Sequence, residues 1–173
     1  LSCLSFNSFI NKNIHVEGIK DIDEQDVINT DKLGYKIKLM GFSEILNNKI
    51  FQRVHPTLVR KNSYIASVNG VLNAVIVDGN PIGKNIIQGE GAGPQATTSA
   101  LISDISSIMR GNIKFPFTIS SKKRKKFSSG KITDLNFSSY IRLNVKDKYG
   151  VLSDVTKVFS ANKVSIKRVL QNP

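Results

Sequence analysis

The chain has few of the residues that build disulfides and metal sites, and it lacks a long apolar run. Cys3 is the single cysteine, so no disulfide can form within the chain, which fits a reducing compartment. The two histidines, His15 and His55, lie far apart, and no CxxC or HExxH motif indicates a metal site. No apolar run reaches the length of a membrane span, and residues 1–10 have no positively charged start. We therefore expect a cytoplasmic protein with no membrane partner and no metal.

The composition is that of a folded protein with a strong positive charge. Hydrophobic residues make up 40% and charged residues 22% of the 173 positions, which predicts one medium domain or two small ones. The net charge of +12 raises the question of nucleic-acid binding, but most of it comes from scattered lysines. The one dense run, residues 122–126, is flanked by serine and glycine without interleaved aromatics. We interpret it as a solvated linker, with weak polyanion binding as the alternative, and expect no nucleic-acid partner.

Residues 88–111 are the stretch around which the chain is organised. A glycine-rich turn at residues 89–93 follows an apolar run and precedes an amphipathic helix with an apolar stripe. Gly111 stands where a left-handed residue ends a helix. A turn of this kind presents backbone N–H groups that suit an anion or the polar end of a cofactor. The alternative is a tight turn with close helix packing, and the GxGxG spacing does not separate the two.

Upstream of this stretch, the pattern predicts an α+β fold, a mixed sheet with helices on one side. Asp23 is a candidate N-cap, and Pro56 should lie at an edge, bulge or strand end because proline has no N–H. For residues 69–74, both a hairpin turn and a short buried helix stay open. The predicted elements are a helix end at 1–9, an extended segment at 14–16, a helix at 23–32, and four or five strands that include 35–45, 49–59, 75–77 and 82–87.

Downstream of it, residues 112–134 are polar and basic and are predicted to be a linker. The pattern then predicts a strand at 137–147, a helix at 151–161 and a strand at 164–170, which together form a βαβ unit. About 35 residues bury too little apolar surface to stand alone. The chain starts without methionine and stops after the last predicted strand, so we expect a piece of a longer protein.

Four blocks in one order, LGYKIKLMG, VHPTLV, ASVNGVLNAVIVDG and GEGAGPQATTSALISDI, closely resemble the C-terminal half of bacterial homoserine dehydrogenases. The tail SSYIRLNVKDKYGVLSDVTKVFSANKVSIKRVLQ resembles the first βαβ of an ACT regulatory domain. The resemblance implies the C-terminal part of a catalytic domain at 1–111, a basic linker at 112–134 and a partial ACT domain at 135–173.

The activity that this resemblance implies is the NAD(P)-dependent interconversion of L-homoserine and L-aspartate 4-semialdehyde, in threonine, methionine and isoleucine biosynthesis. The implied cofactor is NADP or NAD, and the implied assembly is a homo-oligomer. The family's catalytic Lys and Asp and its nucleotide-binding domain are expected upstream of Leu1. We therefore expect no catalytic residue in this chain and no activity from it alone. The alternative is an amino-acid-binding regulatory and dimerisation module without catalysis.

By the same resemblance, Gly93 is the expected cofactor contact and Gly91 a second, conformational candidate. The family's effector turn, Asp-x-Pro-Gly, appears here with Tyr149 in place of proline, and threonine is the natural effector. The expected effector-binding residues are Asp147, Gly150, Val151 and Leu152.

Three further polar residues are weighed from the pattern alone. Lys36 and Lys38 share one face of an alternating strand and are interpreted as a solvated face, with a catalytic role as the alternative. His55 is interpreted as a satisfied histidine near a strand end, with substrate contact as the alternative.

Overall fold

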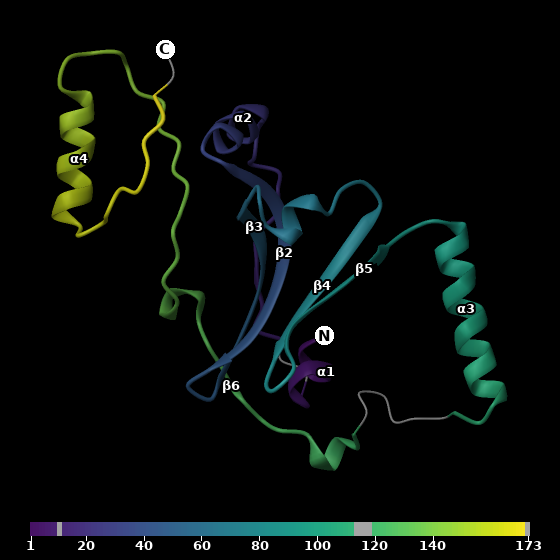
Figure 1. Cartoon of the computed structure of the whole chain (residues 1–173). Coiled ribbons are helices and arrows are strands. Elements are labelled where there is room, and N and C mark those ends of the chain that lie inside the picture. The colour runs from purple at the N-terminus through teal and green to yellow at the C-terminus, as the bar shows by residue number, and fades with distance from the viewer. Residues whose placement is uncertain (10–11, 113–118, 172–173) are drawn as a thin grey trace.

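The computed structural model describes residues 1–9, 12–112 and 119–171, and Figure 1 shows their arrangement. The α-helices are α1 (Ser2–Phe6), α2 (Glu24–Lys32), α3 (Pro94–Met109) and α4 (Val151–Ala161). The strands are β1 (His15–Val16), β2 (Tyr35–Leu46), β3 (Lys49–Arg60), β4 (Leu72–Gly79), β5 (Gly83–Glu90) and β6 (Ser128–Ser129). Short 3-10 helices are η1 (Tyr64–Ser67), η2 (Ser121–Lys123) and η3 (Ile132–Asp134).

The β2–β3 hairpin is the centre of the fold. Its twelve-residue strands are joined by Asn47 and Asn48, whose φ angles of 48° and 59° are those of the two-residue turn that matches strand twist. On the other side of β3, β6 pairs parallel with the start of the strand, at Lys49 and Ile50, and β1 pairs parallel further along, at Arg53 and Val54. The sheet is therefore mixed, and the predicted α+β class is confirmed. Among the described residues, Pro56 has a strand neighbour on one side only, Leu39 of β2, as expected of a proline.

Helix α2 lies against β2 and confirms the helix predicted at 23–32. The Asp23 side chain accepts from the Asp26 N–H at 3.0 Å, and the Asp26 carboxylate accepts from the Asp23 N–H, so the two close a capping box. The small hydrophobic core is formed mainly by side chains of β3 and η1. Ile50 is 2% and Ala66 1% exposed, with Phe51 almost as buried.

Strands β4 and β5 form a separate two-stranded sheet, so the prediction of a single sheet of four or five strands is wrong in this respect. The strand begins at Leu72, and the alternative of a helix near residues 71–74 is also wrong. The β-branched run of Val75, Ile76 and Val77 favours the extended strand over a helix, because branching at Cβ restricts the side chain in a helical turn. Asn80 and Pro81 lie in the turn that joins β4 to β5.

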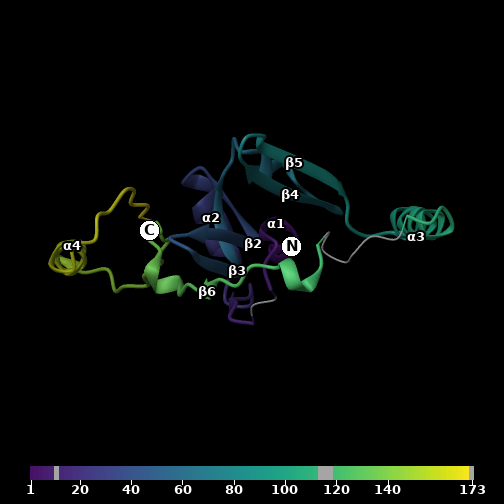
Figure 2. The ribbon, with the colours of Figure 1, turned by 90° about the horizontal axis from the view of Figure 1, so that it is seen from below.

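Helices α3 and α4 project from opposite ends of the molecule, as Figures 1 and 2 show. Neither helix has a buried residue, although both carry apolar stripes. On α3 the exposed apolar side chains are Leu101 (58%), Ile102 (58%), Ile105 (55%), Ile108 (67%) and Met109 (82%). In the part of the chain that is described, no helix is long and apolar enough to cross a membrane.

The C-terminal βαβ unit forms only in part. Helix α4 confirms the predicted helix, but within the described residues neither 137–147 nor 164–170 forms a strand. One side-chain hydrogen bond of 2.7 Å, from Lys167 Nζ to Ser138 Oγ, joins the two segments. An isolated strand pair is at best marginal in water, and Ile141 and Leu143 stay more than half exposed. These strands need a partner strand that the described residues do not supply.

Part of the predicted linker is docked rather than solvated. The backbone of Lys125 exchanges hydrogen bonds with Asn7 (2.8 Å) and Phe9 (3.1 Å), and the Gly130 N–H donates to Ile50 at 2.8 Å. The backbone of residues 125–130 thus pairs with other segments, which the linker prediction did not include, whereas the side chains of Lys125 and Lys126 are exposed, as the solvated interpretation predicts. Lys122 and Lys123 on η2 are exposed, as predicted.

Candidate functional site

The glycine turn predicted as a cofactor contact joins β5 to α3. Gly93 is the N-cap of α3, with φ at +118°, a conformation that side chains other than glycine rarely adopt. A Cβ added at Gly93 would meet nothing within 4 Å, so the space above this backbone is open. The helix behind it is 16 residues long and starts with Pro94 at N1, so its remaining first-turn N–H groups have no intrahelical acceptor. An anionic or polar group can therefore approach here.

At Gly91, glycine is required by packing within the chain rather than by backbone conformation. A Cβ added there would lie 1.3 Å from the Asn73 amide nitrogen, so the side chain of β4 fills its space. Its N–H donates to the Val71 carbonyl at 3.0 Å, which extends the β4–β5 pairing by one residue. Gly91 thus packs within the chain, whereas Gly93 faces open space.

The predicted effector turn precedes α4. Gly150 is the N-cap in a left-handed conformation, with φ at +89°, and its carbonyl accepts from the Asp154 N–H at 3.0 Å. Asp147, Gly150 and Leu152 are exposed. Gly150 is thus left-handed at the start of α4, but within the described residues no strand precedes the turn.

Lys36 and Lys38 are not a solvated face, so that interpretation is wrong. Both side chains are half-buried, and their ammonium groups donate to the backbone carbonyls of Ala66 and Val68. Lys38 also reaches Asn69 Oδ1 at 3.1 Å. Because they hold the chain between η1 and β4, both lysines have a structural role. Leu39, the apolar residue that follows Lys38 on the other face of β2, is 55% exposed instead.

His55 belongs to an aromatic cluster around Arg53, which sequence reasoning missed. The His55 ring stacks on Phe42 with centroids 5.5 Å apart, and its Nδ1 donates to the Pro56 carbonyl at 2.9 Å. The Arg53 guanidinium lies 4.4 Å from the Phe42 ring centre and 5.1 Å from that of Phe137. Arg53 is 8% exposed and pairs with Glu44. A buried cation between two rings is a strong contact, and no spacing rule in the sequence brings Phe137 to β3.

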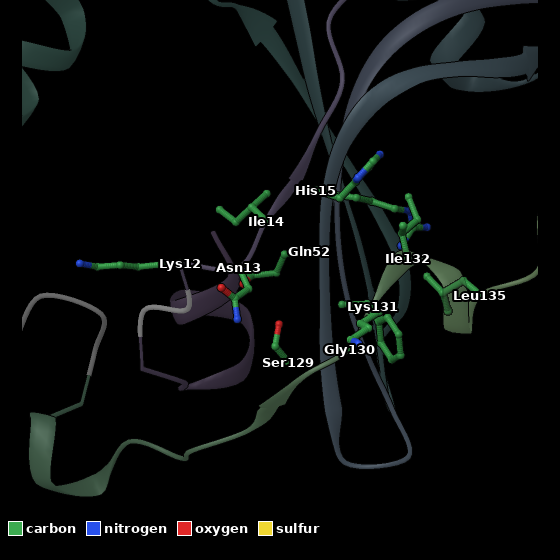
Figure 3. A pocket seen from close by; sticks show the side chains of 12 residues that line it. Lys12, Asn13, Ile14, His15, Gln52, Ser129, Gly130, Lys131, Ile132 and Leu135 are labelled. Carbon is green, nitrogen blue, oxygen red and sulfur yellow. The ribbon is translucent and has the colours of Figure 1, made fainter.

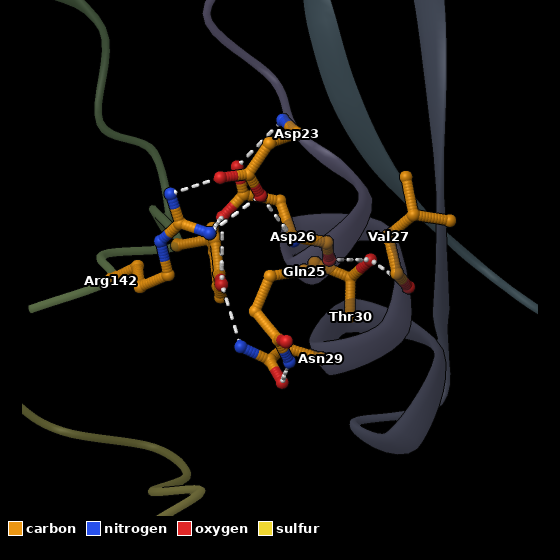
Figure 4. Close-up of polar contacts among 8 residues, drawn as sticks. Asp23, Gln25, Asp26, Val27, Asn29, Thr30 and Arg142 are labelled. Carbon is orange, nitrogen blue, oxygen red and sulfur yellow. Dashed lines mark hydrogen bonds and ion pairs between the residues drawn. The ribbon is translucent and has the colours of Figure 1, made fainter. Parts of the chain in front are cut away.

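A second contact with the C-terminal part lies at the start of α2 (Figure 4). The Arg142 guanidinium donates to both carboxylate oxygens of Asp23, at 2.5 and 2.6 Å, and lies 3.4 Å from Asp26. The Tyr140 hydroxyl donates to Asp26 at 3.1 Å. The hydrogen bond from Arg142, helped by the Asp26 N–H, lowers the pKa of Asp23 from 3.8 to about 2. Burial raises the pKa of Tyr140 above its ordinary value.

Among the residues that the structure describes, no three His, Cys, Asp or Glu side chains gather as metal ligands would. The Gly93 turn has one feature that a dinucleotide cofactor needs: the space next to the Gly93 backbone is open. The structure brings neither His55 nor the two lysines to that turn. His55 lies in the Arg53 cluster, and Lys36 and Lys38 hold the loop before β4.

The curated proteins similar to this chain include homoserine dehydrogenases from several bacteria. Homoserine dehydrogenase of Helicobacter pylori is 34% identical over 158 residues, which cover 91% of this chain and 37% of that protein. Homoserine dehydrogenase of Bacillus subtilis is 31% identical over 166 residues, with 94% and 38% covered. The chain thus spans about two fifths of the length of the curated relatives it matches.

Solved structures give the same family. A homoserine dehydrogenase from Thiobacillus denitrificans superposes with a TM-score of 0.75 at 26% identity, covering 99% of this chain and 41% of that one. A Staphylococcus aureus homoserine dehydrogenase at pH 6.5 gives 0.58 at 37% identity over 70% of this chain and 31% of that one. The sequence model of the family "Homoserine dehydrogenase" matches residues 1–106, more than half of the 173, and on this evidence the chain belongs to the homoserine dehydrogenase family.

Proposed function

We propose that this chain is part of an enzyme that interconverts L-homoserine and L-aspartate 4-semialdehyde with NAD(P). The match of the family model over residues 1–106 carries the proposal. The relatives' names support it, and the open glycine turn before α3 is compatible with it. The reaction belongs to the biosynthesis of threonine, methionine and isoleucine.

The cofactor would approach the chain at Gly93. The backbone of this residue and the N–H groups of Gln95 and Ala96 are the groups that would contact it, because nothing in the chain fills the space there. The nicotinamide, when bound, supplies the hydride chemistry. Gly91 is a weaker contact, since Asn73 occupies its open side.

The test of this cofactor contact is Gly93→Val in a protein that contains the whole enzyme. A Val side chain would occupy the space that the cofactor needs, so the KM for NADP or NAD should rise about tenfold. The strain at φ +118° is expected to open only the first turn of α3, so circular dichroism should show the overall secondary structure retained. Gly91→Ala is the matched control, because it crowds Asn73 within the chain instead. An unchanged cofactor KM in Gly93→Val would remove the turn from the cofactor site.

Residues 1–173 alone should show no oxidation of homoserine with NADP or NAD. The chain spans 37% of its Helicobacter pylori relative, and we propose that the acid/base Lys and Asp lie outside it. The measurement is absorbance at the reduced-nicotinamide band with purified chain. Any turnover above a no-protein blank would mean that the catalytic pair lies within these residues.

The second candidate function, an amino-acid-binding regulatory and dimerisation module, is favoured by the left-handed Gly150 at the start of α4. Its ligand would be threonine, held by Asp147, Gly150 and the N–H groups of Val151 and Leu152, in a homo-oligomer. Titration of threonine into the chain, followed by amide chemical shifts at residues 147–152, tests it. Saturable shifts there, without homoserine turnover, would favour this function for the isolated chain.

A further inference from the structure

Asn69 and Gly70 lie in the loop between η1 and β4, and they are the one Asn–Gly pair in the sequence. Both residues are exposed. Gly70 is left-handed, with φ at +61°, and a Cβ added there would meet nothing within 4 Å. Within the described residues, the hydrogen bonds of this loop leave the Gly70 N–H without a backbone acceptor. The Gly70 nitrogen therefore has neither a side chain nor a backbone partner to hold it away from the Asn69 side chain.

The Lys38 ammonium group on β2 contacts the Asn69 side-chain amide. It donates to Asn69 Oδ1 at 3.1 Å, and its hydrogen bond to the Val68 carbonyl fixes it in place. The amide nitrogen of Asn69 donates in turn to the Ser67 carbonyl at 3.2 Å. A charged donor on a carbonyl oxygen stabilises the negative charge that develops on that oxygen when a nucleophile adds to the carbon. Lys38 thus activates the Asn69 amide toward attack.

We propose that Asn69 is a deamidation site and that Lys38 promotes the reaction. The Gly70 nitrogen adds to Asn69 Cγ, and the new N–Cγ bond closes a succinimide ring. The Cγ–Nδ2 bond then breaks, the Gly70 amide proton passes through water to the leaving group, and ammonia departs. Water opens the ring at either carbonyl. Aspartate forms when the N–Cγ bond breaks, and isoaspartate forms when the bond between the main-chain carbonyl carbon and nitrogen breaks. The net change is hydrolysis of the amide to an acid and ammonia, without oxidation or reduction.

The reaction needs only this chain and water. Figure 3 shows a cavity of about 520 Å³ between residues 12–15, β3 and residues 129–135. Lys38, Asn69 and Gly70 are not among the residues that line it, so a ligand bound in that cavity would not touch the reacting groups.

The modification would alter the start of β4, which supports the glycine turn before α3. The Asn69 carbonyl accepts from the Leu72 N–H at 3.2 Å, and in isoaspartate this carbonyl becomes a free carboxylate. The next contact along the strand is the 3.0 Å hydrogen bond from the Gly91 N–H to the Val71 carbonyl. An isoaspartyl link adds a carbon to the backbone, so these contacts should shift. An effect on a cofactor at Gly93 rests on the proposed function, whereas the deamidation itself does not.

The experiment incubates the 173-residue chain at near-neutral pH, digests it with trypsin and follows the peptide of residues 62–84 by mass spectrometry. Fragmentation of this peptide assigns each conversion of amide to acid to one asparagine. Residue 69 should lose its amide faster than the other asparagines of the same peptide, at 62, 73 and 80. An isoaspartyl-specific methyl-transfer assay should detect the isoaspartate product. Because no step measures homoserine turnover, failure of the proposed enzymatic function would leave this result unchanged.

Variants of the two β2 lysines test the role of Lys38. Lys38→Met should slow the loss of the Asn69 amide about tenfold, because the donor that stabilises the developing oxyanion is gone. Lys38→Arg keeps a charged donor and should retain most of the rate. The matched control, Lys36→Met, removes a half-buried lysine that donates to the Ala66 carbonyl, and it should change the rate less than about twofold. In urea the wild type and Lys38→Met should react equally, because the contact exists only in the fold.

Three outcomes would overturn the proposal or part of it. If Asn69 reacts no faster than the other asparagines of its peptide, it is not a deamidation site. A rate in folded Lys38→Met that equals or exceeds the wild-type rate would remove Lys38 from the reaction. Equal slowing by Lys38→Met and Lys36→Met would mean that anchoring of the loop, rather than the contact with Asn69 Oδ1, sets the rate.

Discussion

Helices α2 and α3 are opposite in composition and in burial. Helix α2 is polar in sequence, yet its Asp26, Asn29 and Thr30 are buried and it lies against β2. Helix α3 is longer and more apolar, yet none of its residues is buried. Thr30 is fully buried because its hydroxyl donates back to the Asp26 carbonyl at 2.8 Å, so burial leaves no unsatisfied group.

An apolar stripe in the sequence therefore predicts that a helix forms, but it does not predict which other segment packs against the stripe. Helix α2 is fixed by its capping box, its Arg142 contact and the sheet. Helix α3 has a stripe that matches no surface among the described residues, and the chain spans about two fifths of its relatives. We propose that the rest of the enzyme covers this stripe.

The largest difference should appear between Ile50→Ala and Ile105→Ala. Ile50 is 2% exposed on β3, so its loss leaves a cavity that should cost about 2–5 kcal/mol in the free energy of unfolding. Ile105 is 55% exposed on α3 and should cost less than about 0.5 kcal/mol. Urea unfolding of the 173-residue chain measures both. A cost above about 2 kcal/mol for Ile105→Ala would show that α3 is packed, in solution, against a second copy.

The second largest difference should appear between alanine substitutions of the two glycines before α3, Gly93 and Gly91. Gly93→Ala forces a side chain into φ +118°, which costs about 1–3 kcal/mol. Because α3 has no buried contact, the strain is relieved by opening its first turn, and amide exchange there should accelerate about tenfold or more. Gly91→Ala meets the end of the exposed Asn73 side chain, which can swing away, so exchange should change by less than about fivefold. Equal effects would show that both positions are limited by packing.

Acid should release the Arg142 contact on α2 but leave α3 unchanged. The pKa of Asp23 is about 2 in the fold, below its ordinary 3.8, so its ionised form stabilises the fold above about pH 4. This contribution is lost as the pH falls from about 4 to 2. The carboxyl carbon shift of Asp23 and amide exchange at residues 140–142 follow it. In Arg142→Gln the pKa of Asp23 should rise toward its ordinary value, and an unchanged titration would mean that the ion pair does not form.

The smallest effect should come from the ion pair on α4. Lys157 Nζ lies 3.2 Å from Asp154, and both side chains are more than 70% exposed, so solvent screens the pair. Lys157→Ala should change the unfolding free energy by less than about 0.5 kcal/mol, by urea unfolding at low and high salt. A salt-sensitive loss above about 1 kcal/mol would place α4 in a packed, charge-dependent interface.

Much of the local structure could be predicted. The N-cap at Asp23, the strands on either side of Asn47 and Asn48, and the start of α3 after Gly93 all follow from local chemistry. The turn at residues 89–93 was predicted as well, but the spacing did not decide whether it is open or packed, and the structure leaves space open at Gly93 and fills it at Gly91. The strands at 137–147 and 164–170 could not be judged in this way, because a strand forms only when another strand accepts its hydrogen bonds.

By itself, the sequence determined the helices, the β2–β3 hairpin, the glycine conformations and the family resemblance, because each depends on neighbours within a few residues or on an ordered set of motifs. Only the tertiary structure decided which faces are covered. It turned Lys36 and Lys38 inward to backbone carbonyls, placed Phe137 beside Arg53 and docked residues 124–134 on β3. The physical reason is that burial and charge pairing depend on segments brought together from far apart in the chain, and no periodicity records which segments those are.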